Sequence, residues 1–131
     1  VADEVIGVGE NAHKLRAPEE DIASGRFRRL PDAHALHVYL QETAVEGDLI
    51  LLKSSNSLHL QRVVLARLGE VRCWTNKCGR RDGCVSCGLW AVPYEDHARA
   101  RSRSRWRRRK EAALRLLPSP LRRLTGAGRM A

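Results

Sequence analysis

The sequence predicts an α/β fold: a partial Rossmann-like parallel sheet with flanking helices, followed by a four-cysteine segment and a basic tail. Two strand-like apolar runs, VIGV at residues 5–8 and LILL at residues 49–52, are each followed by a helical pattern. All four cysteines crowd into one short segment, and most basic residues gather after it. The expected segments are residues 1–70 for the α/β part, 71–92 for the cysteine segment and 93–131 for the tail.

Charge is divided unevenly along the chain. Residues 1–70 carry 8 Lys and Arg against 11 Asp and Glu, whereas residues 71–131 carry 16 against 4. No apolar stretch approaches the roughly 20 residues of a membrane span, and no signal-peptide pattern opens the chain. We therefore expect a cytoplasmic protein without a transmembrane segment. The chain begins at Val1 rather than Met, which is consistent with an alternative start, processing or a piece of a larger polypeptide.

The first predicted strand ends in a glycine turn. Gly7 and Gly9 follow its apolar residues, and a helix is expected over about residues 11–15. A dinucleotide-binding fingerprint would need a third glycine where Ala12 stands. We therefore interpret these glycines as a tight strand-to-helix turn.

Two further helices are predicted before residue 45. A short helix is expected after Pro18, and residues 26–30 form either a strand or an exposed connection. The second helix covers residues 32–43 and has an apolar side. His34 and His37 lie one turn apart on it, but no further ligand is evident nearby. Exposed helix histidines are therefore favoured over a metal site.

The stretch from residue 47 to residue 68 predicts a strand, a polar loop and a helix. Residues 49–52 form an unbroken apolar run, which is typical of a strand buried on both faces. Ligands bind where loops leave the carboxyl ends of such strands, so residues 53–57 form the candidate site. A third strand is expected near Val71. Even so, residues 1–70 are too few to cover both faces of such a sheet. We infer that a partner segment is missing.

These residues resemble the last part of the C-terminal domain of the Mur ligase family. They are most similar to the UDP-N-acetylmuramoyl-tripeptide D-alanyl-D-alanine ligases. The similarity covers about residues 3–68 and includes DEVIGVGE, PDA, GDLILLKSS and QRVV. In that family the strand leads into Lys-Gly-Ser-Arg, whereas the loop here reads Lys53-Ser54-Ser55-Asn56. The lysine, the second serine and the later Arg-Val-Val run match, but the glycine and the arginine are replaced.

The resemblance implies an ATP-dependent amide ligase of peptidoglycan-precursor or related cell-wall biosynthesis. It implies that Lys53, Ser55 and Asn56 contact the amine substrate, and that the full-length enzyme uses ATP and Mg²⁺. Its Gly-Lys-Thr/Ser phosphate loop belongs to a central domain and does not occur in this chain. This chain by itself is therefore expected to be inactive, and the remaining ligase domains or a subunit are its expected partners. The sequence identifies no catalytic residue.

The cysteines follow the pattern C-x4-C-x5-C-x2-C, which predicts a metal site. They are Cys73, Cys78, Cys84 and Cys87. Four thiolates close a tetrahedral zinc shell, and the last pair has the spacing of a zinc knuckle. In a cytoplasmic chain a metal is favoured over two disulfides. Structural zinc is the first interpretation, with an iron–sulfur cluster and reduced or redox-active thiols as alternatives.

The tail from Arg99 to Lys110 holds eight Lys or Arg in twelve residues, which favours phosphate-rich partners. Nucleic acid is one candidate, with Trp106 available for stacking. An anionic membrane surface is an equal candidate, because leucines follow the arginines. The third interpretation is a solvated arginine-rich tail that is partly disordered or helical. The alternative for the whole chain is a non-catalytic zinc-binding α/β adaptor or a nucleic-acid-binding protein.

Overall fold

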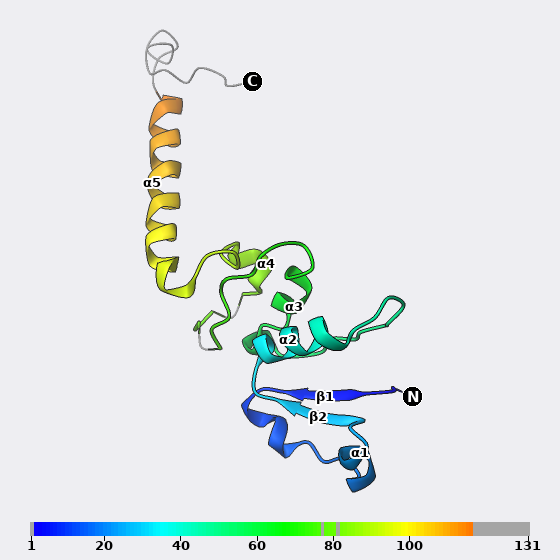
Figure 1. The fold of residues 1–131 in the computed structure, drawn as a ribbon. Helices are drawn as coiled ribbons and strands as arrows, with labels where there is room; N and C mark the ends of the chain where they lie inside the picture. Colours follow the sequence, from blue (N-terminus) through cyan, green and yellow to red (C-terminus); the bar gives the residue numbers. More distant parts are fainter. Residues whose placement is uncertain (1, 77, 81, 117–131) are drawn as a thin grey trace. The chain divides into compact units, whose positions relative to one another are not determined.

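The computed structural model describes residues 2–76, 78–80 and 82–116. The described residues up to Tyr94 form one unit, and those from Glu95 onward form a second. Together they give a mixed α/β chain with a two-stranded parallel sheet, helices and a long C-terminal helix (Figure 1). The elements are β1 Val5–Val8, η1 Glu10–Lys14, α1 Glu19–Ala23, β2 Phe27–Leu30, α2 Ala33–Thr43, η2 Asn56–Leu58, α3 Gln61–Leu65, α4 Cys84–Cys87, η3 Tyr94–Asp96 and α5 His97–Leu116.

The sheet of the first unit joins β1 to β2 in parallel register, with Val5 opposite Phe27 and Val8 opposite Leu30. Of the two alternatives for residues 26–30, the strand is therefore correct. Helix α2 covers one face of the sheet, and η1 and α1 lie on the other (Figure 1). Arg29 of β2 fixes η1 by donating hydrogen bonds to the carbonyl oxygens of Ala12 (3.1 Å) and Leu15 (2.7 Å). The expected helix after the glycine turn is this short 3₁₀ helix.

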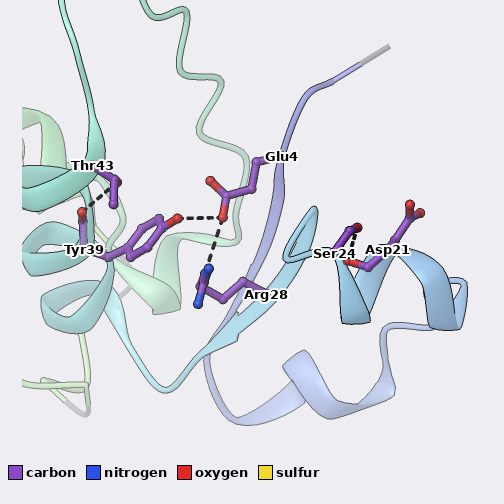
Figure 2. A network of polar contacts seen from close by, with 6 residues as sticks. All are labelled: Glu4, Asp21, Ser24, Arg28, Tyr39 and Thr43. Carbon is purple, nitrogen blue, oxygen red and sulfur yellow. Dashed lines mark hydrogen bonds and ion pairs between the residues drawn. The ribbon is translucent and has the colours of Figure 1, made fainter.

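A polar network ties both strands to α2 (Figure 2). One carboxylate oxygen of Glu4 accepts hydrogen bonds from the Tyr39 hydroxyl (2.8 Å) and from Arg28 Nε (3.4 Å). The Arg28 guanidinium also lies over the Tyr39 ring, 4.8 Å from its centroid. Its hydrogen bond to Glu4 is the main reason that the pKa of Arg28 is raised. The network therefore links Glu4, which precedes β1, to β2 and to α2.

The main apolar core lies between α2, the sheet and α3. Its buried residues are Ala33, Leu36, Leu40, Leu60 and Val63. A second cluster joins Leu65, Val71 and Cys84, and Trp74 packs against both clusters. Trp74 therefore helps to connect the cysteine segment to the α/β part, together with the contacts between α3 and α4.

Three sequence predictions about this region are wrong. Residues 49–52 form no strand, and Leu49 and Leu51 are 98% and 89% exposed. In the described residues no neighbouring strand is present to pair with this run, and apolar character alone cannot make a strand. Val71 is buried in the second cluster but lies in no strand. The helix expected from residue 58 to residue 68 is interrupted, because His59 adopts a left-handed backbone conformation with φ of 52°.

Helix α2 begins where the sequence predicts, and its first turn gives a testable result. Asp32 is the N-cap, and its Oδ1 accepts a hydrogen bond from the Ala35 N–H at 2.8 Å. That bond is the main cause that lowers the pKa of Asp32 from its ordinary value of 3.8. We expect Asp32→Ala to cost about 1 kcal/mol of unfolding free energy at pH 7.

The cost of Asp32→Ala should depend on pH. Because the folded-state pKa lies below the unfolded one, the carboxylate stabilises the fold above the unfolded pKa. This contribution is lost as the pH falls through the folded pKa. Urea unfolding at pH 7 and at pH 3 measures both values, with Asp32→Asn as a capping variant that carries no charge. A cost that stays the same at both pH values would contradict this role.

Candidate functional site

A pocket of about 250 Å³ lies at the carboxyl ends of β1 and β2. Residues 8–11 and 31–33, which follow the two strands, form one side of it. The loop after the exposed apolar run forms the other side, through Ser55, Ser57 and Leu58, and Asn76 completes the lining. The carboxyl edge of a parallel sheet is where α/β proteins bind ligands. The pocket therefore lies at the carboxyl ends of β1 and β2, not after residues 49–52, and it includes Ser55 and Ser57 of the predicted loop.

The two sides of the pocket approach each other closely at Gly9. This residue has φ of 97° and ψ of 178°, a conformation that is essentially restricted to glycine. It turns the chain from β1 into η1 and leaves room for the loop. Leu58 Cδ2 lies only 2.7 Å from the point that a Cβ atom on residue 9 would occupy. The glycine turn in the sequence thus has a definite structural reason.

We expect Gly9→Ala to destabilise the first unit by about 1–3 kcal/mol, because the backbone becomes strained. The added methyl group must also displace Leu58. Gly47→Ala is the matched control, since Gly47 has the same φ of 97° but no atom within 4 Å of its added Cβ. Urea unfolding of both variants separates backbone strain from the contact with the loop. Equal losses would show that the contact with Leu58 is unimportant.

The structure brings together only part of the predicted substrate site. Ser55 lines the pocket, and its Oγ lies 2.7 Å from Oγ of Ser57. Lys53 and Asn56 are exposed and are not among the residues that line the pocket. Asn11 also lines the pocket. The sequence did not predict it as a site residue, because Ser55 and Ser57 on the other side of the pocket are distant in the sequence.

The four cysteines are all free thiols. Cys73 and Cys84 are buried, and Cys78 and Cys87 are partly buried. Burial raises the pKa of the Cys73 thiol, against a lowering by the charge of Arg62 and by a backbone hydrogen bond at Thr75. Among the described residues, no group of three or more His, Cys, Asp or Glu side chains is arranged so that it could hold a metal ion.

His59 joins the cysteines, although no pattern in the sequence singles it out. It is 3% exposed. Its Nε2 lies 3.0 Å from the Cys78 sulfur, and its Nδ1 lies 3.5 Å from the Cys84 sulfur. Burial, and secondarily the charge of Arg62, lower the pKa of His59. The neutral imidazole is thereby favoured, which is the form that binds metals.

Among the described residues, Arg62 is the most deeply buried large side chain, with 1% exposure. Its Nε donates to the Cys84 sulfur at 3.3 Å, and its Nη1 donates to the Thr75 carbonyl oxygen at 2.6 Å. The neighbouring Gln61 accepts a hydrogen bond from the Cys84 N–H at 2.8 Å. Helix α3 therefore presents two side chains to the start of α4. The Arg-Val-Val run carries the resemblance, but nothing in it indicates that its arginine is buried beside a thiol.

The helix histidines have a structural environment of their own. His34 is exposed and His37 is partly buried, and their rings lie 4.9 and 5.0 Å from the Trp74 ring, centroid to centroid. Burial is the main cause that lowers the pKa of His37. The pair therefore packs on an indole ring.

In the second unit, the basic tail forms the helix α5. Arg99, Arg103 and Arg107 follow one another at intervals of four, so they share one side. Arg101 and Arg105 lie on the opposite side. Trp106 is 63% exposed, and Lys110 Nζ lies 5.3 Å from the centroid of its ring. Residues 117–131, with most of the leucines proposed for membrane contact, lie outside the described residues.

Within the described part of the chain, no helix is both long enough and apolar enough to cross a membrane. Comparison of the chain with protein-family models, with curated proteins and with solved structures found no significant match.

Proposed function

We propose that this chain is the C-terminal part of a Mur-type ATP-dependent amide ligase of cell-wall precursor synthesis in the cytoplasm. The observation that carries this proposal is the pocket at the carboxyl ends of the parallel strands, lined by the loop that contains Ser55. The sequence resemblance over residues 3–68 supports it. The two-stranded sheet is then part of a larger Rossmann-like sheet, and the pocket receives the amine substrate.

The exposed apolar run supports the view that the ligase is larger than this chain. Leu49 and Leu51 are 98% and 89% exposed, and Val45 nearby is 69% exposed. Exposed apolar surface of this kind is costly in water and is typical of an interface. The proposed partner is another part of the ligase, which would cover this run and pair with its backbone.

The chemistry of the pocket suits the recognition of a small polar amine. The hydroxyl groups of Ser55 and Ser57 and the amide group of Asn11 offer neutral donors and acceptors. Lys53 and Asn56 remain proposed substrate contacts on the resemblance alone. ATP and Mg²⁺ activate the acid substrate in the full-length enzyme. The residues of this chain bind and orient the amine.

The ligase proposal is tested by measuring amide formation with the full-length protein. The substrates are UDP-N-acetylmuramoyl-tripeptide, D-alanyl-D-alanine and ATP. Ser55→Ala removes a hydrogen-bonding group from the pocket, and we expect it to lower kcat/KM for the dipeptide about 5-fold. Ser24→Ala is the matched control, since Ser24 is an exposed serine in a different part of the unit. No ligation by the unmodified protein would overturn the proposal.

We also propose that the cysteine segment binds a structural zinc ion. Soft thiol groups at Cys73, Cys78, Cys84 and Cys87 are donors that suit zinc. The pairwise contacts between sulfur and imidazole support this proposal, although the side chains must rearrange to enclose an ion. When bound, the ion would cross-link a segment that has few core residues of its own.

The second candidate function is nucleic-acid binding by a non-catalytic adaptor, and α5 favours it. A helix that lies on a membrane needs one apolar face. Arginines on opposite sides of α5 leave no wide apolar face, whereas they suit a partner with phosphates on several sides. Fluorescence anisotropy with duplex and single-stranded RNA, over a range of salt concentrations, tests this candidate. Binding to anionic vesicles but not to RNA would favour the membrane instead.

A further inference from the structure

We propose that His59 is the fourth zinc ligand, together with Cys73, Cys78 and Cys84, and that Cys87 remains outside the shell. This inference rests on the zinc site proposed above and is independent of the ligase assignment. It also gives Arg62 a defined role as the residue that balances the charge of the site. The observations that support it are the distances, the burial and the charge around these side chains.

The distances around His59 are close to those of a zinc shell. With Zn–S near 2.3 Å and Zn–N near 2.0 Å, tetrahedral ligand atoms are separated by roughly 3.6 Å. The contact of 3.5 Å to Cys84 lies near that separation, and the contact of 3.0 Å to Cys78 is shorter. Each sulfur faces a different ring nitrogen, whereas one ion binds only one of them. Zinc binding therefore requires the imidazole to turn, which explains why no complete site stands ready among the described residues.

Three cysteines belong to this group more closely than the fourth. The neighbouring charged and thiol groups that influence the pKa of the Cys73 thiol are Arg62, Cys84 and Cys78. Cys73 and Cys84 are also buried, at 3% and 5% exposure. Cys87, in contrast, is only partly buried, and among the described residues its sulfur forms no hydrogen bond with His59 or Arg62.

The net charge of the site distinguishes a shell of four cysteines from a shell of three cysteines and His59. A zinc ion with four thiolates carries a net charge of −2, whereas three thiolates and a neutral imidazole give −1. The guanidinium of Arg62 is buried beside Cys84, and no carboxylate in the described residues forms an ion pair with it. Because uncompensated buried charge is costly, the single positive charge of Arg62 matches the site that includes His59.

The backbone of His59 supports a specific role for its side chain. Among non-glycine residues, positive φ values are uncommon, and they persist where the surrounding structure holds them. Here the left-handed conformation of His59 ends η2 and separates it from α3. It directs a buried imidazole toward two thiols.

The test combines zinc content with protection of the thiols in the purified 131-residue chain. After reconstitution with zinc, we expect one ion per chain. Alkylation of the folded protein should then modify one thiol, at Cys87, and chelation should expose the others to the reagent. His59→Asn tolerates the left-handed conformation but removes the imidazole. It should weaken zinc binding by more than about 100-fold, beyond the effect of losing an outer-sphere partner.

Cys87→Ser is the matched variant and should retain one zinc ion with unchanged affinity. If Cys87→Ser loses the ion while His59→Asn retains it, the four-cysteine shell is correct and the inference is wrong. Protection of all four thiols in the zinc form would overturn the inference without any substitution. If the unmodified chain binds no zinc, both the zinc site and this inference fail. None of these results changes the outcome of the ligation assay.

Discussion

Arg62→Ala is expected to lower the free energy of unfolding of the first unit by about 3 kcal/mol. The substitution removes the hydrogen bonds that Arg62 donates to the Thr75 carbonyl oxygen and the Cys84 sulfur, and it opens a cavity beside α4. Because Arg62 belongs to α3 and bonds to the cysteine segment, limited proteolysis should also cut residues 71–90 faster. Urea unfolding monitored by circular dichroism measures the loss.

Arg67→Ala is the matched control for Arg62→Ala. Arg67 lies just beyond the same helix but is exposed, and such surface substitutions usually change stability by less than about 0.5 kcal/mol. Arg62→Met keeps an unbranched stem about as long as the arginine chain to Nε and removes the guanidinium charge. Equal stability of Arg62→Ala and Arg67→Ala would contradict the buried role of Arg62.

Trp74→Ala should cost about 3 kcal/mol, because this side chain packs against both apolar clusters. The indole also contacts His34 and His37, and its Nε1 donates a hydrogen bond to the Val71 carbonyl oxygen at 2.9 Å. Its removal should therefore detach the cysteine segment from α2. Hydrogen exchange is expected to rise first in residues 71–90.

Trp106→Ala is the control for the loss of an indole ring. Trp106 lies in the second unit and is 63% exposed, so we expect its substitution to leave the unfolding of the first unit unchanged. If Trp74→Ala is as harmless as Trp106→Ala, the two clusters are not connected through Trp74.

The elements that the sequence predicts correctly are those with local signals. A short apolar run followed by a glycine turn predicts β1, and Asp32 before an apolar stripe predicts α2. For the polar tail segment the sequence is consistent with either disorder or helix, and the structure shows helix for residues 97–116. In these cases capping, turn geometry and periodicity act within a few residues.

The wrong predictions depend on partners that are distant in the sequence. The run at residues 49–52 has strand-like composition, but pairing requires a neighbouring backbone that the described residues do not supply. The interruption at His59 breaks a helical pattern that is otherwise continuous from residue 58 to residue 68. The periodicity of apolar residues contains no information about such tertiary contacts.

The candidate site could be predicted only in part for the same reason. The polar loop after the apolar run and the four cysteines stand out in the sequence, and the resemblance adds Ser55, so Ser55 and Cys84 could be named in advance. His59 and Arg62 could not, because only the fold brings them to Cys84 across more than twenty residues. A single histidine close to the loop was the available signal, and it carries little weight without the structure.

The most direct test of the ligase proposal is a titration of the ¹⁵N-labelled chain with D-alanyl-D-alanine, followed by two-dimensional NMR. We predict that the largest shifts occur at amides around the pocket, including Gly9, Asn11, Ser55 and Ser57, and that L-alanyl-L-alanine produces smaller ones. The amides of α5 should not move. Absence of shifts at the pocket at millimolar dipeptide, or equal shifts with both dipeptides, would contradict the proposal that this pocket binds the amine substrate of a ligase.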